Sequence, residues 1–285
     1  MSAMPTVPTG PTVSQALAQA QGQGVSRTDA QTMMLHLVNP PVRDRAWLIT
    51  HEDHALSDGA WATWCDWVER RAAGVPVAFL TGKKDFYGIE LRINEQVLDP
   101  RPDTETLVDW ALTLAQDLAT PQILDLGTGS GAIALALAHH HPAAKVSAVD
   151  QSEEALAVAL ANAHRLGLQV VFTHSNWFES VAGRFDLIVS NPPYIAEHDP
   201  HLNALVHEPR QALVSGADGL DDLRLLIAQA PNHLTPGGWL LLEHGHDQSR
   251  TVRALLETRG FFQVQSRYDL AGIERCSGGQ WPVVE

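Results

Sequence analysis

The fold of this 285-residue chain is decided by one stretch, Ile123-Leu124-Asp125-Leu126-Gly127-Thr128-Gly129-Ser130-Gly131. An apolar run ends on closely spaced glycines, and an Ala/Leu-rich segment follows over residues 132–140. A strand, a tight turn and a helix in this order form the first unit of a doubly wound sheet, in which glycines let the backbone approach a ligand. The spacing is G-x-G-x-G, which differs from the G-x-G-x-x-G of dinucleotide-binding loops and from the P-loop. The stretch therefore predicts an α/β domain with a ligand site in this turn.

Two acidic residues accompany the glycine loop. Asp125 lies near the end of the predicted strand, and Asp150 ends the next one. A carboxylate at the mouth of the loop repels a pyrophosphate but suits a cationic ligand with an α-amino group. An acid about twenty residues further on can accept both hydroxyls of a ribose. Together the two acids favour S-adenosylmethionine over a dinucleotide as the ligand.

Downstream of residue 121, apolar strands alternate with helical segments, which implies a Rossmann-like, mostly parallel sheet of seven strands. The predicted strands cover residues 123–126, 145–150, 170–174, 185–190, 238–243, 261–269 and 280–284. The predicted helices cover residues 132–140, 152–166, 220–234 and 248–258. Asp103 is placed to cap a further helix, and Ser277-Gly278-Gly279-Gln280 is expected to form a turn that enters the last strand.

A second motif, Asn191-Pro192-Pro193-Tyr194, follows the strand predicted over residues 185–190. Prolines donate no N–H, so the sheet ladder stops here, at the carboxyl end of a strand where open sheets bind their ligands. Asn191 presents an acceptor and two donors in one plane, and Tyr194 offers a flat face. The corner can therefore hold a planar –NH2 group, in an amide or an exocyclic amine. A proline-rich turn with an Asn cap is the plainer alternative, and the glycine loop upstream favours the binding site.

The N-terminal region has a different pattern. Residues 1–13 offer little to bury and are expected to be disordered. A small helical bundle is predicted over residues 14–82, with tryptophans at helical spacing as its core. Residues 83–99 alternate about a turn and are predicted to form a β-hairpin linker. The α/β domain is expected to occupy residues 100–285.

Composition excludes several classes of function. The formal net charge is −14 and no run of Lys or Arg exceeds two residues, which argues against a sequence-independent grip on nucleic acid. The cysteines, Cys65 and Cys276, are far apart, so neither a disulfide framework nor a zinc site is indicated. His139-His140-His141 and the His51–His54 segment lack a third partner at ligand spacing, so no metal is expected. Without a signal-peptide pattern or a membrane-spanning apolar run, we expect a cytoplasmic, monomeric protein with no membrane partner.

These motifs resemble those of the PrmC/HemK family, methyltransferases that modify the glutamine in the Gly-Gly-Gln motif of class 1 peptide-chain release factors. The resemblance runs from about residue 61 to about residue 270. Its segments are Pro76–Gly82, Phe86–Gly88, Val97–Val108, Asp125–Gly131, Asn191–Tyr194, Glu208–Leu213 and Gly216–Leu220.

The resemblance implies a role for each motif. Asp125–Gly129 would cradle the methionine part of S-adenosylmethionine, Asp150 would bind its ribose and Trp177 would lie by its adenine. Asn191–Tyr194 would hold the glutamine amide, with class 1 release factors as partners, and S-adenosylhomocysteine would be the product. The family usually has an acid before this tryptophan and an apolar residue at position 99, where this chain has Asn176 and Asp99.

The expected catalysis is positioning rather than proton transfer by a strong base. The Asn191 side-chain oxygen and the Pro192 carbonyl would accept hydrogen bonds from the amide –NH2, against the ring of Tyr194. The main competing reading is an N6-adenine methyltransferase acting on nucleic acid, because the same corner holds any planar exocyclic amine. A docking module without catalysis and a nicotinamide dehydrogenase are two further possibilities, and the glycine spacing weighs against the dehydrogenase.

Overall fold

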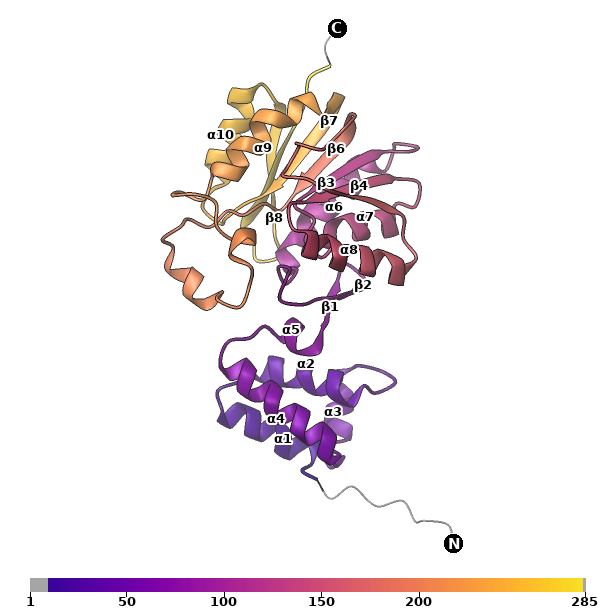
Figure 1. Ribbon diagram of the computed structural model, residues 1–285, viewed down its shortest axis with the longest axis vertical. Coiled ribbons are helices and arrows are strands. Elements are labelled where there is room, and N and C mark those ends of the chain that lie inside the picture. The colour runs from indigo at the N-terminus through magenta and orange to yellow at the C-terminus, as the bar shows by residue number, and fades with distance from the viewer. Residues whose placement is uncertain (1–9, 284–285) are drawn as a thin grey trace. The chain divides into compact units, whose positions relative to one another are not determined.

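The computed structural model describes residues 10–283. The chain divides into two compact units, one that ends at Gly82 and one that begins at Lys83 (Figure 1). Each unit has its own hydrophobic core, which fits the separate helical and α/β patterns of the sequence.

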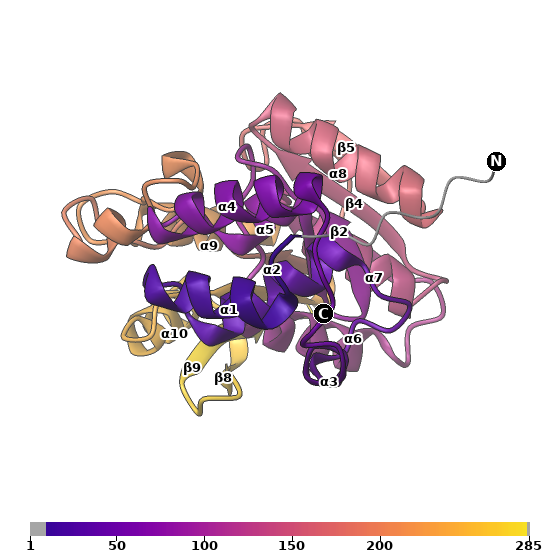
Figure 2. The ribbon, with the colours of Figure 1, turned by 90° about the horizontal axis from the view of Figure 1, so that it is seen from below.

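The first unit is a bundle of helices. They are α1 (Val13–Gly22), α2 (Arg27–Val38), α3 (Arg45–Thr50), α4 (Asp58–Ala72) and α5 (Val77–Thr81). Helix α2 contacts α1, α4 and α5 (Figure 2). Ser26 and Ser57 cap α2 and α4 through hydrogen bonds from the backbone N–H groups of Asp29 and Ala60. Trp64 is fully buried and donates to Gln19 Oε1 over 3.0 Å, so the tryptophan face of α4 belongs to the core as predicted.

Part of the predicted N-terminal tail is structured. Thr12 caps α1 by a capping box, since its hydroxyl accepts from Gln15 N and its own N–H donates to Gln15 Oε1. Val13 is fully buried in the bundle core. The prediction of disorder is therefore wrong for residues 10–13, because the capping box of Thr12 and the buried side chain of Val13 hold this segment in place. Residues 1–9, for which disorder was also predicted, lie outside the described residues.

The predicted hairpin exists and belongs to the second unit. Strands β1 (Lys83–Phe86) and β2 (Ile89–Arg92) pair antiparallel. The buried side chain of Asn162 fastens the hairpin to the α/β unit: Oδ1 accepts from Arg92 N over 2.7 Å, and Nδ2 donates to Arg92 O over 3.0 Å.

The second unit contains the seven-stranded sheet that the sequence predicts. Its spatial order is β5 (Val170–His174), β4 (Lys145–Asp150), β3 (Gln122–Leu126), β6 (Phe185–Ser190), β7 (Leu234–Glu243), β9 (Glu274–Gln280) and β8 (Phe262–Tyr268). The first five strands pair parallel, and β9 runs antiparallel to both of its neighbours. The carboxyl ends of β3, β4, β6 and β7 therefore meet at one edge.

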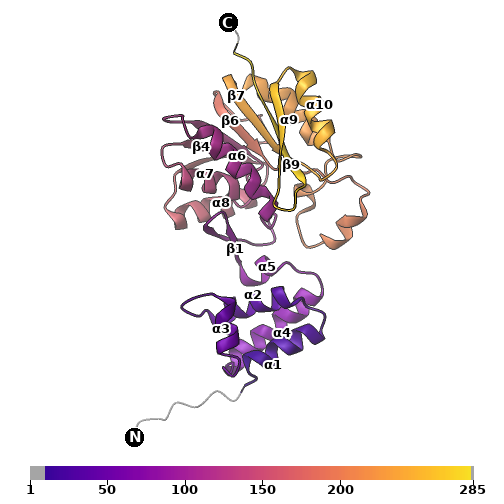
Figure 3. The same cartoon turned by 180° about the vertical axis from the view of Figure 1, so that it is seen from behind.

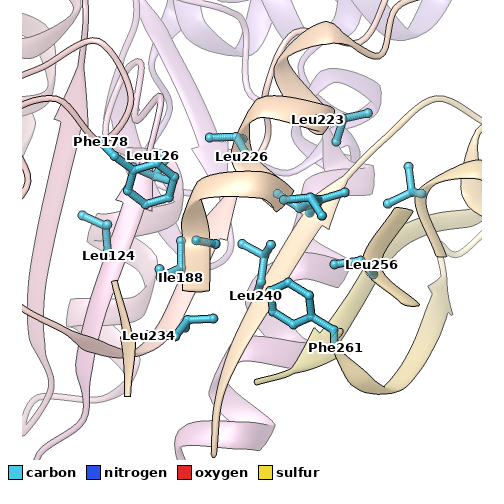
Figure 4. Close-up of a cluster of buried hydrophobic side chains, with 14 of the residues drawn as sticks. Leu124, Leu126, Phe178, Ile188, Leu223, Leu226, Leu234, Leu240, Leu256 and Phe261 are labelled. Carbon is cyan, nitrogen blue, oxygen red and sulfur yellow. The ribbon is translucent and has the colours of Figure 1, made fainter. Parts of the chain in front are cut away.

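Helices cover both faces of this sheet (Figures 1 and 3). One face carries α6 (Glu105–Ala115), α7 (Ala132–His140) and α8 (Glu153–Leu166), and the other carries α9 (Asp221–Gln229) and α10 (Ser249–Arg259). Alternate residues of β3 and β7 meet α9 and α10 in a buried cluster (Figure 4). Each leucine buried there contributes about 1.5–3 kcal/mol relative to an exposed one. The cluster fixes the strands whose ends form the site.

The last strand lies earlier in the chain than the sequence predicts. Ser277–Gln280 forms the second half of β9 rather than a turn. A Cβ at Gly278 would lie 2.6 Å from the carbonyl oxygen of Leu240 and 3.0 Å from the Trp110 ring, so glycine here permits close packing. Paired glycines are typical of turns, but in β9 close packing requires them, at Gly278 against Leu240 and Trp110 and at Gly279 against Phe261 and Val264.

Two further predictions are corrected. The helix predicted over residues 220–234 ends at Gln229, and a 3₁₀ turn that contains Pro231 separates it from β7. Asp103 does not cap α6 but lies in the 3₁₀ turn Pro102–Thr104 and pairs with Arg275 Nη2 over 3.4 Å. Over the described residues, no helix combines the length and apolar composition needed to cross a bilayer.

Candidate active site

A pocket opens at the carboxyl ends of β3, β4 and β6. It is a concave site that opens to solvent at the edge where open α/β sheets bind their ligands. Its lining residues are Gln96, Val97, Leu98, Gly127, Gly129, Asp150, Gln151, Ser152, Ala155, Ser175, Asn176, Trp177, Asn191, Pro193, Pro209, Gln211 and Ala212. We call it the first pocket.

The glycine loop forms the floor of the first pocket. Gly127 has φ +71°, and a Cβ there would lie 3.2 Å from the ring of Trp177. Gly131 has φ +84°, and a Cβ there would lie 2.9 Å from Leu135 and 3.2 Å from Ala159. The first glycine thus leaves room for the tryptophan, and the last lets α7 pack against α8.

Asp125 lies buried beneath this loop. Its Oδ2 accepts from Thr128 Oγ1 over 2.6 Å and from Ala134 N over 3.2 Å, whereas Oδ1 has no hydrogen-bond partner among the described residues. Burial raises the pKa of Asp125 to about 7, and these hydrogen bonds oppose the rise. A buried carboxylate oxygen without a partner attracts a cationic group, so Asp125 fits the α-amino group of S-adenosylmethionine.

Asp150 ends β4 at the pocket wall. Its Oδ2 accepts from Gly129 N over 2.8 Å, and its Oδ1 accepts from Ser152 N over 2.9 Å. Burial raises the pKa of Asp150, and the hydrogen bonds from Ser152 and Gly129 oppose this shift. The carboxylate is held firmly, and its remaining lone pairs can accept from ribose hydroxyls.

Trp177 and Asn176 are neighbouring lining residues of the first pocket. The indole Nε1 of Trp177 donates to Asp222 Oδ1 over 3.1 Å, and the residue adopts the left-handed region with φ +48°. Asn176 Nδ2 donates to Glu179 Oε1 over 2.8 Å. This contact turns the side-chain Nδ2 of Asn176 toward Glu179, at the position where the family resemblance leads us to expect an acid.

A second pocket lies beside the first, and Asn191 lines both. The lining residues of the second pocket are Leu98, Arg101, Asn191, Tyr194, Ile195, Leu205, Ala212 and Leu213. Asn191 Nδ2 donates to the hydroxyl of the buried Thr104 over 3.1 Å, which leaves its Oδ1 as the free acceptor.

Tyr194 joins the corner to a buried acid at the end of β7. Its hydroxyl donates to Glu243 Oε1 over 3.3 Å, and Glu243 is fully buried. Burial raises the pKa of Glu243 to about 7, while hydrogen bonding from Thr104 and Tyr194 lowers it. Burial and the negative charge of Glu243 also raise the pKa of Tyr194, so the phenol keeps its proton.

An ion-pair cluster borders the second pocket. Arg101 Nη2 lies 2.5 Å from Oε1 of the buried Glu208. Asp99 Oδ1 forms an ion pair with Lys84 Nζ over 3.0 Å. The lysine therefore compensates the negative charge of Asp99, which stands where the family resemblance leads us to expect an apolar residue. The cluster anchors Arg101 at the pocket wall.

The structure places the predicted site residues in two layers. Gly127, Gly129, Asp150, Trp177 and Asn191 line the first pocket with Pro193, and Tyr194 lines the second. The buried layer beneath consists of Asp125, Leu126, Thr128 and Pro192.

Sequence reasoning assigned no site role to Thr104, Glu243, Pro209, Gln211 or Ala212, although all of them except Glu243 lie in segments that carry the family resemblance. The signal for Glu243 was a lone acid that ends the apolar run of residues 239–242. The contact of Thr104 with Asn191 had no local signal, because only the fold brings the two residues together.

Comparison with known proteins gives consistent matches along the chain. The methyltransferase small domain matches residues 104–220, and the PrmC N-terminal domain matches residues 12–82. A release factor glutamine methyltransferase of Xylella fastidiosa is 48% identical over 94% of this chain and 98% of its own length. A protein of the same description from Bordetella pertussis is 47% identical over 90% of this chain and 95% of its own length.

Among solved structures, a methyltransferase from Pyrococcus furiosus has a TM-score of 0.53 at 18% identity, over 75% of this chain and 98% of that one. This likeness concerns the fold alone. The identity and coverage of the sequence relatives decide the family, and on that evidence the chain belongs to the release factor glutamine methyltransferases.

Proposed function

We propose that this protein transfers a methyl group from S-adenosylmethionine to the side-chain amide nitrogen, N5, of the glutamine in the Gly-Gly-Gln motif of class 1 release factors. One observation carries the proposal: Asn191 lines both pockets, with its Nδ2 bound to Thr104 and its Oδ1 left to accept. A cofactor in the first pocket and an amide in the second would therefore meet at this residue. We expect a monomer in the cytoplasm.

The residues of the first pocket suit S-adenosylmethionine. The unpartnered Oδ1 of Asp125 offers a negative charge for the α-amino group, and Asp150 offers acceptors for the ribose. Trp177 presents an aromatic surface beside Gly127 for the adenine. When bound, the cofactor supplies an electrophilic methyl group and leaves S-adenosylhomocysteine as the product.

The corner residues hold the amide and its protons. An amide nitrogen is a poor nucleophile because its lone pair is shared with the carbonyl. Asn191 Oδ1 and the Pro192 carbonyl would accept from the two N–H bonds, which fixes the nitrogen and stabilises the positive charge that grows on it. Positioning of this kind can supply roughly 7–11 kcal/mol. The nitrogen then gains one methyl group and loses one proton to water.

The test measures transfer of a labelled methyl group to purified release factor, to a variant with Gln→Ala in its Gly-Gly-Gln motif, and to duplex DNA and RNA. Label on the wild-type factor alone, mapped to that glutamine, is the expected result. Label on nucleic acid alone would contradict the proposal and would mean that the corner holds an adenine amine.

A further inference from the structure

We propose that the turn between β8 and β9, residues 268–273, docks the surface of the release factor that adjoins its Gly-Gly-Gln motif. We call this turn the β8–β9 tip, and it is the yellow loop beside the β8 and β9 labels in Figure 2. The inference rests on the proposed function and adds to it a contact surface for the protein substrate outside both pockets.

The β8–β9 tip presents apolar side chains to solvent. Leu270 is fully exposed, Tyr268 is 63% exposed and Ile273 is 36% exposed. A single exposed leucine is ordinary on a protein surface, but apolar side chains grouped on one turn are typical of a contact surface. The group is small, so it suits one part of a larger interface rather than a separate binding site.

The turn is fixed by Asp269, which is buried. Its Oδ1 accepts from Ala271 N and from Ile273 N, each over 2.9 Å, and its Oδ2 accepts from Arg275 Nε over 3.3 Å. Asp269 N also donates to Ile273 O over 2.9 Å. Leu270 therefore projects from a preorganised turn, so a protein that covers it does not have to order this backbone first.

The sheet topology places the β8–β9 tip at the edge where the pockets open. Strand β9 runs antiparallel to both β7 and β8, so β8 is parallel to β7 and ends at the same edge. Glu243, the last residue of β7, pairs with Cys276, so the tip lies beyond the end of β7. Neighbouring strands lie about 4.8 Å apart, which places β9 about 10 Å to the side of β6, the strand that Asn191 follows.

Arg275 connects the base of the tip to the substrate corner. Its side chain lies 3.3 Å from Asp269 Oδ2 and 3.4 Å from Asp103 Oδ2. Asp103 is next to Thr104, whose hydroxyl accepts from Asn191 Nδ2 over 3.1 Å. The tip is thus fastened to the backbone segment that contacts the amide corner.

The proposed substrate supplies the occupant of this surface. A glutamine side chain can reach Asn191 only if the protein that carries it approaches this edge of the sheet. A typical protein interface covers about 800 Å² on each partner, which is a patch roughly 30 Å across. The tip, about 10 Å to the side of β6, lies within such a patch centred on the corner. The surface that flanks the Gly-Gly-Gln loop is therefore the one expected to cover Leu270.

The test measures steady-state methylation by Leu270→Gln in the full-length chain. Glutamine removes the apolar contact, and the fold is kept because the leucine is fully exposed. On whole release factor we expect KM to rise about tenfold at unchanged kcat, which is the pattern left by a lost binding contact. Tenfold corresponds to about 1.4 kcal/mol, less than full burial of a leucine contributes. On a short Gly-Gly-Gln peptide, which does not reach the tip, kcat/KM should stay within about twofold of wild type.

Leu160→Gln is the matched control. Leu160 is 59% exposed and lies about two turns from the start of α8, away from the sheet edge. The same substitution there should leave KM for whole release factor within about twofold of wild type.

Unchanged KM for whole release factor in Leu270→Gln would overturn the inference, and so would an equal rise of KM on the peptide. Sedimentation of both proteins tests the other occupant, a second copy of this chain. A wild-type dimer that Leu270→Gln converts to a monomer would assign the tip to that copy and overturn the inference as well. Failure of the wild-type protein to methylate both release factor and peptide would instead contradict the proposed function.

Discussion

Asp125 illustrates how burial at a single residue sets a property of the whole site. Its carboxyl is closed off from water, and burial raises its pKa to about 7. A protonated carboxyl cannot pair with a cation, so binding of S-adenosylmethionine must displace the proton wherever the pH lies below this pKa.

We therefore predict that the affinity for S-adenosylmethionine rises with pH and levels off near neutrality. Below the raised pKa, each unit of pH should change Kd by up to about tenfold, since binding releases one proton. Isothermal titration between about pH 5.5 and about pH 7 measures this slope. In Asp125→Asn the affinity should be lower and the slope smaller, and an equal slope in both proteins would contradict the role of Asp125.

At the residue scale, the sequence predicts a site residue when that residue lies in a recognisable local motif. Asp150 ends a predicted strand, Asp125 lies near the end of one, and Asn191 directly follows one. Their position at one sheet edge therefore follows from parallel pairing. Thr104 lies far along the chain from Asn191, and only the fold brings the two side chains together. Such a partner cannot be predicted from spacing.

At the scale of elements, β9 shows that glycines required by close packing can give a strand the sequence pattern of a turn. Its glycines oppose Leu240 and Leu241 in the sheet register, and a Cβ at Gly278 would meet the Leu240 carbonyl at 2.6 Å. The strands that lack such crowding, β4, β5 and β6, were predicted with their observed bounds. A sequence pattern identifies strands by their hydrophobic residues. It fails where, as at Gly278, close contact with the backbone of a neighbouring strand requires a glycine.

We predict that Gly278→Ala destabilises the protein by about 1–3 kcal/mol, as overpacking of a tight interior does. Urea denaturation, followed by near-ultraviolet circular dichroism, measures the free energy of unfolding. Gly59→Ala in α4 is the control, because no atom lies within 4 Å of the added Cβ, and it should be neutral or stabilising by up to about 1 kcal/mol. Equal stability of Gly278→Ala and wild type would contradict the account of β9.

At the scale of the whole molecule, the helical unit that ends at Gly82 and the α/β unit have separate cores. Every residue that lines the two pockets belongs to the α/β unit. We propose that the helical unit recognises the body of the release factor, because a Gly-Gly-Gln loop offers few side chains to specify a partner.

We predict that a chain beginning at Lys83 still binds S-adenosylmethionine but loses most of its kcat/KM on whole release factor. A loss of about 100-fold is expected if the docking surface supplies a few kcal/mol of binding energy. The control is a short Gly-Gly-Gln peptide, on which the truncated and full-length chains should act equally. Undiminished kcat/KM on whole release factor would exclude a docking role for the helical unit.

The central claim is that Asn191 holds the substrate amide between the two pockets. The most direct measurement is the single-turnover rate of Asn191→Ala on release factor, with S-adenosylmethionine saturating and its Kd measured in parallel. Removal of one preorganised polar group predicts a fall of about 100-fold or more at unchanged cofactor affinity. A rate close to that of the wild-type protein, at the same affinity, would contradict the claim.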